Sequence, residues 1–325
     1  MADVFDKKYV YQVARLRSHE LSLFDAQATD NLCSFKTIKE LIDFLKEKGF
    51  GKEEDKTVAT LILSERKKLW TLIDELVNDK NVFDVFRLKN DYNNIKAIIK
   101  ESVINKSFEN IIIEETTLDI DAIRLAVRDR NYQSLSDELV EPISKAHEVL
   151  LKSPDVQKAD LIIDRACLEA MLKAKKETDD DFLKMYAELI VATANIKIAY
   201  RAILTRKDEN FLQEALAECD TLNKTRLIES TLKGLDSFYS FLESTDYAES
   251  VPLLKESFFA FEKWCESRIV KRMKEELYNS FGLGPIASYI LAKENELKNV
   301  KIVAAGIENG LPVEKIQERL VETYV

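Results

Sequence analysis

A tripeptide of the form Asn-aliphatic-Lys recurs three times along this chain of 325 residues. It occupies residues 94–96, 195–197 and 299–301, at intervals of roughly 100 residues. So loose a pattern would arise about once by chance in a chain of this length, without a regular spacing. The regular spacing therefore indicates that the chain contains three copies of one structural unit.

The scarcity of residues that break helices predicts that this unit is helical. The chain has only 7 Gly and 5 Pro, whereas 33% of its residues are Asp, Glu, Lys or Arg. Such a composition favours long helices with short connections. A chain of this size that was rich in β-sheet would need more turns built on Gly. We therefore expect an all-α fold.

The spacing of apolar residues predicts where these helices lie. The segments with helical spacing are 8–24, 38–48, 57–79, 81–100, 135–152, 160–176, 182–205, 209–224, 225–244 and 289–306. Thr117 or Asp119 is expected to cap a further short helix, and Pro312 suits the first turn of the last one. The predicted domains are residues 1–105, 106–208 and 209–325. The N-terminal helix is a candidate to pack with the C-terminal unit, because Tyr11-x-x-Ala14-Arg15 resembles the sequence at residues 289–293.

Charge and composition exclude several classes of protein. The net charge is −10, and Lys and Arg alternate with Asp and Glu, so no basic stripe is available for nucleic acid or anionic lipid. The four Cys are widely separated, as is ordinary for buried thiols in a reducing compartment. The N-terminus has no apolar signal-peptide core, and no apolar run is long enough to span a membrane.

Motifs that carry chemistry are absent. The sequence contains no phosphate-binding loop of the form GxxxxGK[ST] or GxGxxG. His19 and His147 are the only histidines, and neither belongs to a metal-binding pair. The acidic run at residues 179–181 lacks the spaced ligands of a calcium loop, so we interpret it as a solvated corner between helices. We predict no catalytic, cofactor-binding or metal-binding residue, and no cofactor.

Two interpretations of the repeated tripeptide remain open. In the structural one, which we favour, Asn closes a polar contact between helices, the aliphatic residue points inward and Lys points outward. In the functional one, Lys96, Lys197 and Lys301 occupy equivalent points on a pseudo-threefold surface and contact one partner.

The two ends of the chain resemble a known family. The N-terminal segment YVYQVARLRSHELSLF is similar to the family's opening helix, and FGLGPIASYILAKENELKNVKIVAAG followed by GLPVEKIQERL is similar to its C-terminal signature. The family is that of the C subunits of prokaryotic V-type (A-type) ATPases, which are related to the d subunits of eukaryotic vacuolar ATPases. Ser18 and His19 depart from the commoner Ala and Leu, and the first repeat is the most diverged.

The resemblance implies three helical-bundle domains arranged as a funnel. Family members receive the central stalk, which consists of the D and F subunits, and sit on the membrane rotor ring of proteolipid subunits. The resemblance therefore implies a non-catalytic rotor subunit that transmits torque for ATP-linked proton or sodium transport. Its expected location is the cytoplasmic face of the membrane, without insertion into it.

Two other classes of function are compatible with a repetitive helical chain. One is a helical-repeat scaffold that binds proteins outside any rotary ATPase, and co-purification with ATPase subunits would distinguish it. The other is an all-α enzyme with an Asp/Glu metal site, for which divalent metals should raise the melting temperature.

Overall fold

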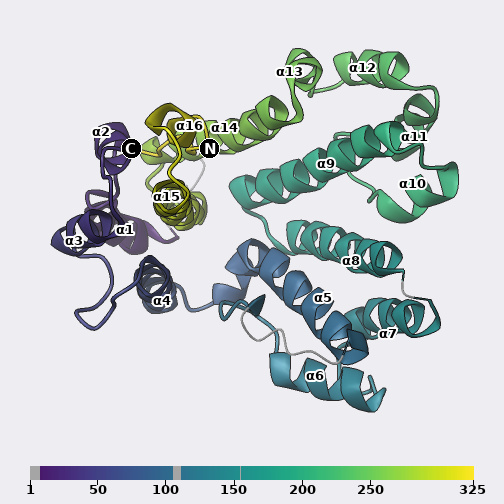
Figure 1. The fold of residues 1–325 in the computed structure, drawn as a ribbon, viewed down its shortest axis with the longest axis horizontal. Coiled ribbons are helices and arrows are strands. Elements are labelled where there is room, and N and C mark those ends of the chain that lie inside the picture. Colours follow the sequence, from purple (N-terminus) through teal and green to yellow (C-terminus); the bar gives the residue numbers. More distant parts are fainter. Residues whose placement is uncertain (1–7, 105–110, 154) are drawn as a thin grey trace, which may run out of the picture. The chain divides into compact units, whose positions relative to one another are not determined.

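Every regular element in the described part of the chain is helical (Figure 1). The computed structural model describes residues 8–104, 111–153 and 155–325, and no strand occurs in these ranges, which confirms the all-α prediction. Two compact units are formed: unit 1 comprises the described residues up to 80 with 180–183 and 253–325, and unit 2 comprises 81–179 and 184–252. The three predicted domains stay a prediction, and their boundary at residues 105–106 lies outside the described residues.

Unit 1 is built from helices of both ends of the chain. Its elements are α1 (Val10–Glu20), α2 (Ala26–Leu32), α3 (Ile38–Glu47), α4 (Val58–Leu76), α14 (Phe258–Glu275), the 3-10 helix η3 (Glu276–Tyr278), α15 (Gly284–Glu308) and α16 (Val313–Gln317). Thr37 and Thr57 fix the starts of α3 and α4. The hydroxyl of each threonine accepts the main-chain N–H of the residue three positions later, and the side chain of that residue accepts the main-chain N–H of the threonine.

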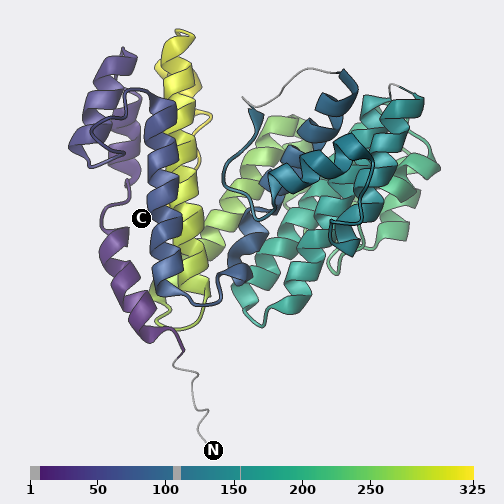
Figure 2. The ribbon, with the colours of Figure 1, turned by 90° about the horizontal axis from the view of Figure 1, so that it is seen from below.

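Helix α15 is the centre of unit 1. It packs against α1, α2, α3, α4, α14 and α16, and α4 runs beside it in Figure 2. Leu297, Val300 and Val303 of α15 contribute to a core that also includes Leu41 and Leu61. Because side chains on all sides of α15 are buried, its sequence has little amphipathic periodicity.

A glycine allows α16 to approach α15 closely. A Cβ atom added at Gly306 would lie 2.5 Å from side-chain carbons of Ile316, which is too close for a real contact. Ile316 is itself buried in the core of unit 1. The absence of a side chain at Gly306 therefore lets Ile316 pack directly on the helix.

Unit 2 contains most of the remaining helices. Its elements are the 3-10 helix η1 (Lys80–Phe86), α5 (Leu88–Ile104), α6 (Ile120–Asp129), α7 (Asp137–Lys152), α8 (Val156–Glu177), α9 (Asp181–Leu204) except for its first turn, α10 (Glu209–Ala215), α11 (Lys224–Leu232) and α12 (Leu235–Glu243). The last of these helices, α13 (Ser250–Glu256), is divided between the units, because its residues from Leu253 onward belong to unit 1. Asp119 caps α6 by accepting the N–H of Ala122 at 3.0 Å. The Thr117 hydroxyl donates to Asp91 instead and does not cap the helix.

The core of unit 2 lies between α5, α7 and α8. Helices α7 and α8 follow each other closely in the sequence and pack together over much of their length, and α5 packs against both. Ile95, Ile143 and Ile163 are buried in this core, one from each helix.

The segments predicted as helices at 209–224 and 225–244 differ from what the structure contains. Three helices, α10, α11 and α12, occur there. Gly234 separates α11 from α12 with a positive φ of 102°, a conformation that favours Gly. Residues 216–223 are not helical, because their main chain makes other bonds, which are described next.

Candidate functional site

The asparagine of each repeated tripeptide makes the same pair of hydrogen bonds. Asn94, Asn195 and Asn299 are buried in α5, α9 and α15, and each side chain bonds to the main chain of one later residue. The Nδ2 atom donates to the carbonyl oxygen and the Oδ1 atom accepts from the N–H of that same residue. The three bound residues and their two distances are Ile113 (2.9 and 2.9 Å), Ala217 (2.8 and 3.0 Å) and Val321 (2.9 and 2.8 Å).

We call this arrangement the asparagine clamp. The bound residues stand 19, 22 and 22 positions after their asparagines, and none of them lies in a helix. A buried main-chain N–H and C=O need partners, and outside a helix no neighbouring turn supplies them. The side-chain amide offers one acceptor and two donors, so it can satisfy both groups at once. The clamp therefore fixes a returning segment on its helix.

An acidic side chain reinforces two of these clamps. Asp91 precedes Asn94 on α5. The carboxylate of Asp91 accepts hydrogen bonds from the N–H of Thr117 at 2.8 Å and from the hydroxyl of Thr117 at 2.6 Å. On α9, Glu188 accepts the N–H of Thr221 at 2.7 Å and its hydroxyl at 2.8 Å. Both threonines stand four residues after the clamped residue. The repeat inferred from the sequence is therefore also a repeat of hydrogen bonding.

The lysines of the tripeptides have different surroundings. The side chain of Lys96 is only 19% exposed, and its Nζ lies 2.7 Å from Oδ1 of Asp164. Lys197 is half-buried and Lys301 is exposed. The aliphatic residues between Asn and Lys are all buried, as the structural interpretation predicts. That these lysines contact a partner stays a prediction.

Unit 1 contains a buried ion cluster beside its clamp. Lys293, Glu65 and Glu296 have side chains that are 9%, 7% and 4% exposed. The Nζ atom of Lys293 lies 3.0 Å from Oε2 of Glu65 and 2.6 Å from Oε1 of Glu296. It also lies 4.3 Å from the centroid of the Phe50 ring. The ammonium group is thus surrounded by two carboxylates and an aromatic face.

Each carboxylate of the cluster also accepts main-chain N–H groups. Glu65 accepts from the N–H of Gly51 at 2.9 Å and from Nζ of Lys68 at 2.7 Å. Glu296 accepts from the N–H of Phe24 at 2.6 Å. Burying a charge costs free energy unless it is paired and hydrogen-bonded, and these contacts meet that requirement. The cluster therefore links α15 and α4 to the segments at Phe24 and Gly51.

The electrostatic balance keeps the ammonium group charged. Burial acts to lower the pKa of Lys293, but the attraction of Glu296 and Glu65 is larger together, and the pKa is raised. Burial raises the pKa of Glu296, and Lys293 opposes this shift. The cavity beside Glu296 has a volume of only about 10 Å³, enough for one water molecule at most. The cluster is thus closed to substrates.

Sequence reasoning missed this cluster. A signal existed, because Lys293 and Glu296 have opposite charges and stand three residues apart in one helix, a spacing that places them on one face. Glu65, their partner, lies in a distant segment, and only the fold shows that it is near.

His147 has the neighbours of a catalytic histidine but the wrong direction of hydrogen bonding. Its Nε2 atom lies 3.1 Å from Oγ of Ser102, and its Nδ1 atom lies 2.7 Å from the hydroxyl of Tyr132. The Ser102 hydroxyl donates its proton to the carbonyl oxygen of Ile99 at 2.7 Å. The Oγ atom therefore accepts a hydrogen bond from Nε2–H of His147, and a protonated Nε2 atom cannot take the proton of the Ser102 hydroxyl. Burial, with a contribution from Arg130, lowers the pKa of His147. This group therefore acts as a neutral link between helices.

The acidic run at residues 179–181 is also structural. Asp180 accepts the N–H of Leu183 at 3.0 Å and the N–H of Leu283 at 3.2 Å, so its carboxylate fixes the starts of α9 and α15. Within residues 8–104, 111–153 and 155–325, no group of three His, Cys, Asp or Glu residues is placed to hold a metal ion. In the same ranges, no helix is both long enough and apolar enough to cross a membrane.

Comparison with known proteins identifies relatives along nearly the whole chain. The C subunit of the V-type sodium ATPase of Enterococcus hirae is 22% identical, over 95% of this chain and 97% of its own length. The C subunit of the A-type ATP synthase of Methanocaldococcus jannaschii is 26% identical, over 96% of this chain and 86% of its own. The C subunit of the V-type ATP synthase of Thermus thermophilus is 23% identical, over 72% of each chain.

The family model described as ATP synthase (C/AC39) subunit matches residues 12–319. This range includes all three asparagine clamps apart from the last bound residue, Val321. The match confirms the family indicated by the two ends of the sequence. The chain therefore belongs to the ATP synthase (C/AC39) subunit family.

Proposed function

We propose that this chain is a non-catalytic rotor subunit of a V-type (A-type) ATPase that connects the central stalk to the membrane rotor ring. Membership of the C/AC39 family carries the proposal, together with relatives named as C subunits of such ATPases. In this role the chain transmits torque between ATP hydrolysis or synthesis and ion transport, and it carries out no reaction itself.

The internal contacts of the chain suit a part that transmits force. A torque coupler has to resist bending, and its segments between helices are the places where it would yield. The asparagine clamps fix three such segments, and the ion cluster fixes two more at Phe24 and Gly51. Buried and fully hydrogen-bonded polar groups favour one arrangement of helices over alternatives.

The partners we propose are the D and F subunits of the stalk on one side and the proteolipid ring on the other. Three helical domains would form a funnel that receives the foot of the stalk. The protein would lie on the cytoplasmic face of the membrane without entering it. Lys96, Lys197 and Lys301 remain candidates for partner contacts. Whether protons or sodium ions move would be decided by the ring.

Reconstitution tests the coupling role directly. The ATPase would be assembled in lipid vesicles with and without this chain, and ATP hydrolysis and ion uptake would be measured on the same samples. We expect that omission of the chain leaves hydrolysis by the catalytic head but abolishes ion uptake. Equal ion uptake in the two preparations would refute the coupling role. Absence of the chain from the assembled complex would instead favour a separate helical scaffold.

A further inference from the structure

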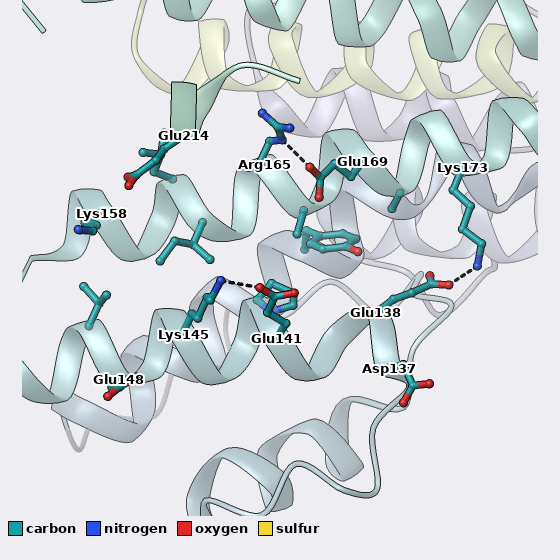
Figure 3. Close-up of a pocket in the computed structure, with 17 residues that line it drawn as sticks. Asp137, Glu138, Glu141, Lys145, Glu148, Lys158, Arg165, Glu169, Lys173 and Glu214 are labelled. Carbon is teal, nitrogen blue, oxygen red and sulfur yellow. Dashed lines mark hydrogen bonds and ion pairs between the residues drawn. The ribbon is translucent and has the colours of Figure 1, made fainter. Parts of the chain in front are cut away.

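A groove runs along the outer side of the α7–α8 pair in unit 2 (Figure 3). Its volume is about 700 Å³, and it is open to solvent. On α8 its lining extends from Lys158 to Lys173, which at 1.5 Å per residue corresponds to about 22 Å. A groove of that length matches four turns of an α-helix.

The floor of the groove is largely apolar, and Tyr92 of α5 also lines the groove. Half-buried apolar side chains of α7 and α8 form the floor, namely Pro142, Val149, Leu161, Ile162, Ala166 and Ala170. Ile162, Ala166 and Ala170 stand at intervals of four residues and so follow one line along α8. Small side chains on such a line allow the backbone of another helix to approach closely.

The two rims of the groove have opposite charge. The α7 rim carries four carboxylates and a single cation, which are Asp137, Glu138, Glu141, Glu148 and Lys145. The α8 rim carries three cations and a single carboxylate, which are Lys158, Arg165, Lys173 and Glu169. Glu214 of α10 lines the groove on the same side, so this side has three cations and two carboxylates in all. Figure 3 shows these groups along the edges of the floor. A partner that fits must therefore be positive along one edge and negative along the other.

The rim charges can exchange partners. Lys145 pairs with Glu141 on α7, and Arg165 pairs with Glu169 at 2.7 Å on α8, each within one helix. The pair between Lys173 and Glu138 joins the two helices at one end of the groove. The pairs of Lys145 and Lys173 are exposed, whereas the Arg165 side chain is only 21% exposed. Exposed pairs contribute little to stability, so a bound partner can replace the pairs of Lys145 and Lys173 without disturbing the fold.

We propose that the α7–α8 groove binds an amphipathic helix of a partner protein. That helix has an apolar face with basic residues along the edge that meets α7 and acidic residues along the edge that meets α8. Helices dock in apolar grooves through side chains at positions i, i+3 or i+4, and i+7, which is the spacing found along this floor. If this helix were reversed with the same face on the floor, its basic and acidic edges would exchange places. The charges of the two rims therefore determine the direction in which the helix lies. This proposal is independent of the rotary role.

Two synthetic peptides of identical composition test the proposal against the full chain. Both are helical peptides of about 16 residues, the length that matches the groove at 1.5 Å per residue, with the same apolar face. In the ordered peptide, all Lys lie on one edge and all Glu on the other; in the mixed peptide, both edges carry both. We expect the ordered peptide to bind at least about tenfold more tightly, measured by calorimetry at low salt. Equal binding of the two peptides, or no binding up to about 1 mM, would overturn the proposal.

Variants of the chain locate the binding. The double variant Glu138→Lys/Glu141→Lys reverses the charge of the α7 rim at exposed positions, so the fold is preserved. We expect this variant to bind the ordered peptide at least about tenfold more weakly. Ala166→Trp fills the floor and should abolish binding. Glu229→Lys is a control for position, because Glu229 is an exposed acidic residue on α11 outside the groove. An equal loss of affinity in Glu229→Lys, or none in the double variant, would contradict the proposed site.

Discussion

Helices α15 of unit 1 and α9 of unit 2 carry the same asparagine clamp in different surroundings. Six residues before the clamp asparagine, α15 has Lys293 and α9 has Leu189; three residues before it, α15 has Glu296 and α9 has Ala192. All four side chains are buried. The clamp is therefore compatible with charged or with apolar residues at these two positions. This indicates that the clamp is the common device and that the cluster of Lys293, Glu65 and Glu296 is particular to unit 1.

The difference predicts different sensitivity of the two helices. On α9 the two corresponding positions, Leu189 and Ala192, are apolar, and apolar positions tolerate changes of side chain if volume is kept. The buried charge near this clamp is Glu188, which pairs with Lys175 at 2.7 Å. Around α15 the neighbouring positions are charged, and removal of one partner leaves an uncompensated charge. We expect substitutions in unit 1 to have the larger effects.

The largest effect should follow removal of the ammonium group. Lys293→Leu, which installs the residue found in α9, leaves the buried carboxylate of Glu296 without its cation. We expect a loss of about 3–5 kcal/mol in the free energy of unfolding, measured by urea denaturation. The triple variant Lys293→Leu/Glu65→Gln/Glu296→Gln keeps the acceptors for the main chain without the charges. It should recover most of the loss, and a triple variant as unstable as the single one would argue against an electrostatic cause.

Removal of a clamp should have an intermediate effect in either unit. Asn195→Ala and Asn299→Ala each leave a buried N–H and C=O without partners, and we expect each to cost about 1–3 kcal/mol. Thermal and urea unfolding of the two variants measure this cost. If only one variant is destabilised, the clamps are not equivalent and the comparison fails.

A smaller, pH-dependent effect on stability is expected from His147 in unit 2. The pKa of His147 is lowered in the folded chain, so the unfolded chain binds its proton more readily. The contribution of neutral His147 to stability is therefore complete above its ordinary pKa of 6.5 and is lost as the pH falls below that value. Urea midpoints between pH 7 and pH 5 should fall more for the native chain than for His147→Gln. Parallel pH profiles would show that His147 makes no such contribution.

The smallest effect is expected for the partly exposed ion pair of the first repeat. Lys96→Met removes the pair with Asp164, which is 54% exposed and well solvated. We expect a change of about 0–1 kcal/mol, which should diminish further in high salt. A loss as large as that of the Asn94→Ala variant would mean that the lysine, rather than the asparagine, holds the first repeat together.

The sequence predicted features that depend on local pattern. The helical class, the starts of α3 and α4, and the inward position of the aliphatic residue in each tripeptide follow from composition and periodicity, and all are found in the structure. The structural interpretation of the tripeptide placed a polar contact of Asn between helices. The polar contact exists, but its expected partner was wrong, because each Asn bonds to the main chain of a residue outside a helix. The sequence did not indicate this partner, because a main-chain segment about 20 residues away has no side-chain signature.

Features that depend on distant segments could not be predicted. The ion cluster joins Glu65 to Lys293, which are separated by most of the chain, and no local pattern links them. Residues 216–223 have helical spacing, but Asn195 binds the main chain of Ala217 and holds it outside a helix. In both cases a tertiary contact decided the outcome, as it commonly does when local preferences are weak.

Amide hydrogen exchange at Ile113, Ala217 and Val321 tests most directly whether one clamp is built three times. All three N–H groups lie outside helices and donate to a clamp asparagine. We predict that all three exchange slowly, and that Asn94→Ala, Asn195→Ala and Asn299→Ala each accelerate exchange about tenfold or more at their own partner only, as expected for a loss near 1.4 kcal/mol. Exchange at any of the three as fast as in an unstructured segment would contradict the account.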